Sequence, residues 1–152
     1  MEALILTIIA TSIPLLLAAT GELITEKSGI LNLGVEGMML SGAAGGFAVV
    51  LWLGNPYYGI VAGALCGALM ASIFCLFTIN LMTNQVATGL GLTIFAIGLT
   101  GLAGAPLIGK TIPSLPKIEI FLFSDIPLVG NILFKQDFVA YLSIGILSLI
   151  HI

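Results

Sequence analysis

Long charge-free apolar stretches alternate with shorter polar segments along this chain. Four such stretches cover residues 3–20, 37–53, 59–81 and 86–104. A helix needs about 20 apolar residues to cross the roughly 30 Å of hydrocarbon in a bilayer. Backbone polar groups in lipid must find their hydrogen-bond partners within the protein. Each stretch is therefore predicted to be a membrane-spanning helix.

A fifth apolar run, residues 138–152, is shorter and stops without a polar flank. We therefore expect the chain to be a fragment of a longer protein, truncated inside a fifth span. The longer polar segments, 21–36 and 105–137, precede the second and the fifth span. The predicted fold is all-α: a polytopic transmembrane helical bundle that forms a single membrane domain over residues 1–152.

The composition is consistent with lipid as the solvent around most of the chain. Charged residues make up 7% of the sequence and hydrophobic residues, counted without glycine, 59%. Soluble domains have about 25% charged and about 45–50% apolar residues. Arginine is absent, so the sequence offers no support for a nucleic-acid surface. The lipid bilayer is the predicted environment.

Small residues recur at four-residue spacing in the second and third spans. Gly42 and Gly46 lie in the second span, and Gly59, Gly63 and Gly67 in the third. Because lipid provides no hydrophobic force between helices, such small faces act by letting backbones approach closely. We expect these glycines to be helix-packing positions, with a glycine-lined path as the alternative.

Two polar clusters are candidates for a solute path. Asn32 and Glu36 lie one helical turn apart in segment 21–36, directly before the second span. Carboxylates beside a span usually face water, a partner or a cavity, and transporter sites often use broken helices. Asn84 and Gln85 precede the fourth span, and amides both donate and accept hydrogen bonds. Solvated loops and helix caps explain both clusters as well.

Catalytic, metal and nucleotide sites have little support. The run Gly104–Thr111 matches the nucleotide-binding pattern G-x-x-x-x-G-K-[ST], which needs a strand before it and a helix after it. An apolar span precedes this run, and Pro113 and Pro116 follow it, so we interpret the match as coincidental. His151 lacks a Cys/His cluster for zinc and partners for nucleophilic catalysis. We predict that the chain has no metal site and no cofactor and that it is not an enzyme.

The run at residues 21–43, GELITEKSGILNLGVEGMMLSGA, resembles the N-terminal region of bacterial ABC-transporter permeases. The most similar group is the nucleoside-type branch, related to ribose and branched-chain amino acid permeases. The run TNQVATGL at residues 83–90 also resembles this group, in the element before its next span. The resemblance covers nearly the whole chain but only about the first half of a permease. The matching positions of the first run are Gly21, Glu22, Glu26, Lys27, Gly29, Asn32, Gly34, Glu36, Gly37, Met38 and Met39.

This resemblance implies a permease subunit of an ATP-driven ABC importer in the bacterial cell membrane. Such an importer would move nucleosides or similar small polar solutes, with sugars and amino acids possible, by alternating access. The implied partners are a second permease subunit, cytoplasmic ATP-binding subunits that hydrolyse ATP, and an extracytoplasmic solute-binding lipoprotein. The resemblance also places loop 82–85 in the cytoplasm and loop 105–136 outside, against the weak lysine bias of the latter. A non-transporting membrane assembly or anchor subunit is the alternative.

Overall fold

The computed structural model describes residues 2–119 and 135–151. The last turn of α3 widens into a π-helical turn, η1 (Leu76–Asn80), and α4 is followed by a 3-10 turn, η2 (Ala105–Leu107). Two short strands, β1 (Lys117–Glu119) and β2 (Lys135–Asp137), pair antiparallel. The α-helices are α1 (Glu2–Lys27), α2 (Val35–Leu53), α3 (Pro56–Cys75), α4 (Gln85–Gly104) and α6 (Phe138–His151).

Within the described residues, four helical segments are long and apolar enough to cross a membrane. They are Leu4–Lys27, Val35–Leu53, Pro56–Asn80 and Gln85–Leu107. These segments confirm the predicted helical membrane fold. The helix Phe138–Ser148 is apolar but shorter. Residues 120–134 of the predicted polar segment and Ile152 of the predicted fifth span lie outside the described residues.

The first helix is longer than its apolar run, because it continues through the charged residues up to Lys27. It ends where Gly29 adopts a φ of +85°, a left-handed conformation that glycine adopts without steric cost. The Gly29 amide donates to the Glu26 carbonyl at 2.9 Å, and the Ile30 amide to the Thr25 carbonyl at 3.1 Å. This pair of bonds is a common helix terminus, because it satisfies carbonyls that lack a partner in the helix.

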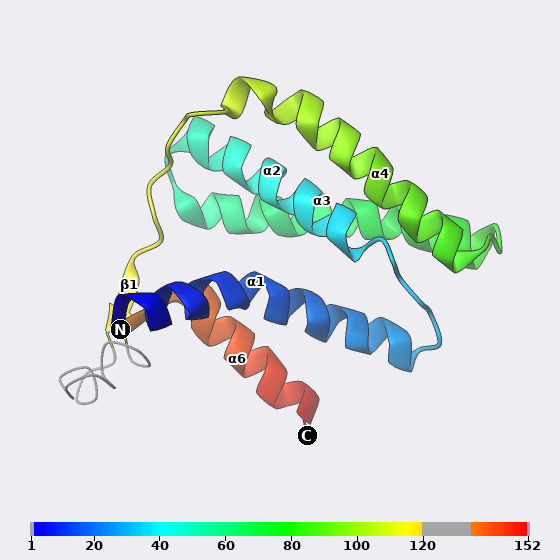
Figure 1. The fold of residues 1–152 in the computed structure, drawn as a ribbon, viewed down its shortest axis with the longest axis horizontal. Helices are drawn as coiled ribbons and strands as arrows, with labels where there is room; N and C mark the ends of the chain where they lie inside the picture. Colours follow the sequence, from blue (N-terminus) through cyan, green and yellow to red (C-terminus); the bar gives the residue numbers. More distant parts are fainter. Residues whose placement is uncertain (1, 120–134, 152) are drawn as a thin grey trace. The chain divides into compact units, whose positions relative to one another are not determined.

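The chain divides into two compact units, Met1–Leu23 with Leu115–Ile152, and Ile24–Ser114. In the second unit α2, α3 and α4 lie alongside one another, and α2 packs against both neighbours (Figure 1). Its buried core consists of Met70, Phe74, Leu92 and Ala96, with Ile30, Met38 and Ile73 packed against it.

A tight turn reverses the chain between α2 and α3. Gly54 has a φ of +71°, and its amide donates to the Val50 carbonyl at 2.7 Å, which closes α2. The Asn55 side chain accepts a bond of 3.0 Å from the Tyr57 amide and caps α3. Pro56 occupies the first position of that helix, where its missing amide hydrogen costs nothing. The turn returns α3 alongside α2.

Glycines bring the backbones of α2 and α3 together. A Cβ at Gly42 would lie 3.0 Å from the carbonyl oxygen of Gly63, and a Cβ at Gly46 would lie 2.8 Å from that of Gly59. Any larger residue at Gly46 must therefore displace backbone. Gly67 lies farther from α2, since the nearest atom to a Cβ there is 3.7 Å away.

Candidate functional site

The segment that joins α1 to α2 packs directly on the N-terminal half of α4. A Cβ at Gly89 would lie 2.8 Å from the amide nitrogen of Gly34 and 2.9 Å from that of Leu33. Gly37, in the first turn of α2, approaches α4 in the same way, because its Cβ would lie 2.9 Å from the Cα of Thr93. Only glycines permit backbones to come this close. The segment is therefore part of the packed bundle.

Side chains of α4 hydrogen-bond to the backbone of this segment. The Gln85 side-chain oxygen accepts a bond of 2.8 Å from the Leu31 amide. Two turns later, the Thr93 hydroxyl donates a bond of 3.2 Å to the Leu33 carbonyl. A net contribution of about 1 kcal/mol is typical for each such bond. Together these bonds hold the segment along two turns of α4.

Asn32 determines how the chain enters α2. Its side chain is buried, with 6% of its surface exposed. The side-chain oxygen accepts a bond of 2.9 Å from the Gly34 amide, and the nitrogen lies 3.5 Å from the sulfur of Met38. Asparagine commonly bonds the backbone two residues ahead in this way and so stabilises a turn.

The other predicted path residues lie around the same junction. Glu36 is exposed in the first turn of α2, where the helix dipole favours a negative charge. Asn84 is exposed, and its side chain caps α4 by accepting a bond of 3.0 Å from the Ala87 amide. The structure thus brings Asn32 and Gln85 to one short segment. Asn84 caps the helix that carries Gln85. The prediction that Asn32 and Glu36 lie one helical turn apart was wrong, because α2 begins only at Val35 and Asn32 lies in the non-helical segment before it.

Sequence reasoning missed Gly89 and Thr93, which lie within an apolar span. A signal was nevertheless present, because Gln85, Gly89 and Thr93 follow at four-residue intervals and so share one face of a helix. That face carries the amide, the glycine and the hydroxyl that hold the segment before α2.

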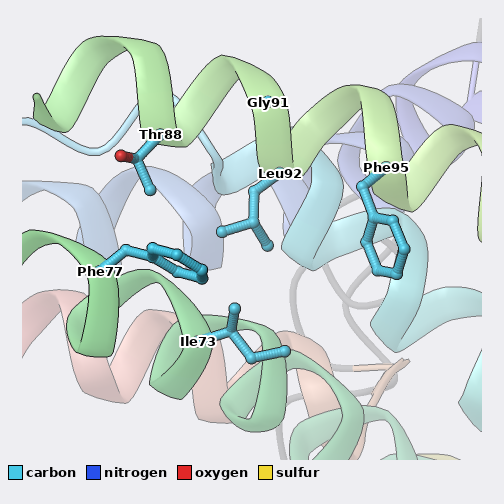
Figure 2. Close-up of a pocket in the computed structure, with 6 residues that line it drawn as sticks. All are labelled: Ile73, Phe77, Thr88, Gly91, Leu92 and Phe95. Carbon is cyan, nitrogen blue, oxygen red and sulfur yellow. The ribbon is translucent and has the colours of Figure 1, made fainter. Parts of the chain in front are cut away.

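A groove of about 330 Å³ lies between the end of α3 and α4 (Figure 2). It is lined by Ile73, Phe77, Thr88, Gly91, Leu92 and Phe95. Figure 2 shows the Thr88 oxygen pointing away from Leu92. The interior of the groove is therefore lined by apolar groups. None of the four predicted path residues lines it.

A second cavity, of about 250 Å³, is bordered by α2, α3 and α4. Small residues of α2, including Ala44 and Gly45, line one wall, and Thr100 of α4 lines another. The Ser41 hydroxyl at this cavity is buried and has no hydrogen-bond partner among the described residues. The predicted path residues do not line this cavity either.

The run Gly104–Thr111 begins at the last residue of α4 and continues through η2. Gly109 has a φ of +79°, Lys110 is exposed, and residues 110–116 form no helix. A nucleotide-binding loop requires a helix that starts directly after its Gly-Lys pair. The described residues also contain no group of three His, Cys, Asp or Glu side chains that could hold a metal ion.

Comparison with known proteins adds to this geometry. A family model described as the permease component of the branched-chain amino acid transport system matches residues 4–150. A putative glucose ABC transporter permease protein of Haloferax volcanii is 40% identical over 134 residues, which cover 86% of this chain and 41% of that protein. No solved structure matches.

The names of two further relatives refer to guanosine and to nucleosides. A guanosine ABC transporter permease protein of Bacillus subtilis is 31% identical over 150 residues, 91% of this chain and 46% of that protein. A nucleoside ABC transporter permease protein of Lactococcus lactis is 28% identical over 149 residues, 90% of this chain and 46% of that protein. The chain spans less than half the length of each of these relatives.

Proposed function

This chain belongs to the family of branched-chain amino acid transport permease components, and we propose that it serves in an ATP-driven importer of small polar solutes. The family match over residues 4–150 carries the proposal, and four helices of membrane-spanning length support it. The chain is a multi-pass membrane protein and a transport component. The proposed partners are a second permease subunit, cytoplasmic subunits that hydrolyse ATP and an extracytoplasmic solute-binding lipoprotein. The proposed location is the bacterial cell membrane.

The names of the relatives favour a solute that contains a sugar. They refer to glucose, guanosine and nucleosides. Nucleosides and glucose share an uncharged ring with several hydroxyl groups. We therefore place neutral sugar-containing solutes, nucleosides above all, ahead of amino acids as the class that this transporter moves.

Among the four candidate path residues, Glu36 is the strongest candidate for contact with the solute. The Asn32, Asn84 and Gln85 side chains accept hydrogen bonds from backbone amides of this chain. The Glu36 side chain is exposed beside the junction of the segment with α4. A carboxylate accepts hydrogen bonds from sugar hydroxyls, and bonds to charged groups are the stronger ones.

Uptake by the assembled transporter tests both parts of the proposal. Membrane vesicles that contain the chain with its partners should accumulate labelled guanosine or glucose in an ATP-dependent manner, with leucine as the comparison. Glu36→Gln should weaken the apparent affinity for the solute by about fivefold to tenfold, since the amide oxygen still accepts a bond, but a neutral bond contributes about 0.5–1.5 kcal/mol and a bond to a charged group about 1.5–3 kcal/mol. The matched control is Glu26→Gln, another exposed carboxylate, at the end of α1.

Two outcomes distinguish a wrong assignment of Glu36 from a wrong proposal of an importer. Normal uptake by Glu36→Gln at unchanged membrane abundance would exclude Glu36 from the path and leave the importer intact. If none of the labelled solutes accumulated with ATP, while the wild-type complex was assembled, the importer proposal itself would be refuted.

A further inference from the structure

The end of α3 winds differently from the rest of that helix. In the π turn η1, the Leu81 amide donates to the Leu76 carbonyl, five residues earlier, at 3.1 Å. The Thr78 hydroxyl is buried and donates to the Phe74 carbonyl at 2.8 Å. A π turn accommodates one residue more than an α-helical turn, and such turns are rare and frequent at functional sites.

The loop that follows η1 contains a backbone conformation that is energetically unfavourable by itself. Met82 has a φ of +50°, a left-handed conformation that is costly for residues with a Cβ. The next residue, Thr83, donates from both its amide and its hydroxyl to the Phe77 carbonyl, at 3.1 and 2.9 Å. These bonds tie the loop back to the start of the π turn and maintain the conformation of Met82.

The Thr83 hydroxyl also reaches α4. Its oxygen lies 2.9 Å from the Thr88 hydroxyl oxygen. Because a hydroxyl has one proton and Thr83 directs its own at the Phe77 carbonyl, Thr88 must donate the proton between the two hydroxyls. The hydroxyl of Thr83 is therefore the point where η1, the loop and α4 are joined. We call this set of bonds the threonine clasp.

Both partners of the threonine clasp line the apolar groove of Figure 2. Phe77 borders it from η1 and Thr88 from α4. The hydroxyl of Thr88 points away from the groove, and its hydrogen bond goes to Thr83. The threonine clasp therefore connects the loop to one residue of each wall of the groove.

We propose that residues 76–83 form a conformational latch that the threonine clasp holds closed. When the clasp opens, η1 rewinds as α-helix, the extra residue passes into the loop, and Met82 leaves its left-handed conformation. Rewinding changes the angular position of the side chains that follow Leu76, because each residue of an α-helix turns the chain by a fixed angle. Phe77 then leaves the groove, so the loop controls the shape of the groove. This device does not depend on which solute is transported.

Hydrogen exchange at single-residue resolution tests the latch, on the chain assembled with its partners in lipid nanodiscs. Thr83→Val removes the hydroxyl and keeps the shape of the side chain, so amides 78–81 and 83 should exchange together roughly thirtyfold faster, as expected for loss of two hydrogen bonds. Thr83→Ser keeps the hydroxyl and should exchange like the wild type. The control is Thr100→Val, because the Thr100 hydroxyl bonds only within α4 among the described residues.

A second variant, Thr88→Val, removes the proton donor to Thr83 and should produce the same pattern if the clasp acts as a unit. It also provides the test if Thr83→Val does not assemble. Faster exchange of amide 83 alone would show local fraying and would overturn the latch. Unchanged exchange in both valine variants would overturn it too.

Discussion

Replacing Gly89 by alanine would place a methyl group where two segments of backbone already touch. A Cβ at this position would lie 2.8 Å from the Gly34 nitrogen, 2.9 Å from the Leu33 nitrogen and 3.0 Å from the Leu33 carbonyl carbon. All three are backbone atoms, so no side chain can rotate away to make room. The segment before α2 must move off α4, and the hydrogen bonds to Gln85 and Thr93 stretch with it.

Opposing terms determine the magnitude. Alanine is favoured over glycine in a helix by roughly 1 kcal/mol, which would stabilise α4. Overpacking in a tight contact costs about 1–3 kcal/mol. The two hydrogen bonds across the contact contribute about 1 kcal/mol each. We therefore expect Gly89→Ala to lower the free energy of unfolding by about 2–4 kcal/mol.

Gly91 provides the matched control on the same helix. No atom lies within 4 Å of a Cβ at Gly91, so Gly91→Ala should be neutral or stabilising by up to about 1 kcal/mol. Unfolding in mixed micelles, with denaturing detergent as the titrant and circular dichroism as the signal, measures both variants. Equal unfolding free energies for the two alanine variants would refute the close contact at Gly89, because propensity alone predicts no difference between them.

Three other substitutions test a helix cap, a hydrogen bond and a second close contact between backbones. Asn84→Ala should destabilise α4 by about 0.5–2 kcal/mol through loss of its cap, and Asn84→Ser should retain most of that stability in the same unfolding assay. Thr93→Val removes the donor to the Leu33 carbonyl and should cost about 1 kcal/mol; wild-type stability would contradict the bond. Gly46→Ala presses on the Gly59 carbonyl, and the overpacking cost of about 1–3 kcal/mol less the roughly 1 kcal/mol gained in helix propensity leaves a net loss of up to about 2 kcal/mol. The midpoint of thermal unfolding should therefore lie below that of Gly91→Ala, and equal midpoints would count against the crossing of α2 and α3.

The membrane helices could be predicted from the sequence, because in lipid the length and apolarity of a run are nearly sufficient to define a span. The end of α1 could not be placed from apolarity. Its last turns carry charged residues up to Lys27, which suggested a loop. Helical hydrogen bonds continue regardless of side-chain charge until a residue adopts a non-helical backbone conformation. In this chain Gly29, with its positive φ, is that residue.

Sequence reasoning selected four polar residues near this junction and allowed for a helix cap such as that of Asn84, but it missed Gly89 and Thr93 and did not foresee that Asn32 and Gln85 pair with backbone amides. The sequence suggested amides that bind a solute, because nothing in a single sequence shows which backbone groups will lack a partner. An irregular segment packed on a helix has amides and carbonyls without helical partners, and pairing is obligatory where such a group is buried, as the Gly34 amide is. Nearby polar side chains therefore form hydrogen bonds with these backbone groups and are not available to a solute. The Leu31 amide, the Gly34 amide and the Leu33 carbonyl are paired with Gln85, Asn32 and Thr93, respectively.

This pairing changes what a loss of transport would mean at each position. A variant of Asn32 or Gln85 leaves a backbone amide of the segment without its partner, so reduced uptake there would follow from displaced backbone even if no solute touched either side chain. Glu36 is exposed and accepts no such bond among the described residues, so Glu36→Gln leaves the packing in place and loses only the helix-dipole contribution of about 0.3–1 kcal/mol. A fall in solute affinity with a loss of no more than about 1 kcal/mol in unfolding free energy can therefore be assigned to contact with the solute at Glu36, but a larger fall in unfolding free energy is expected at Asn32, whose bond to the Gly34 amide is buried.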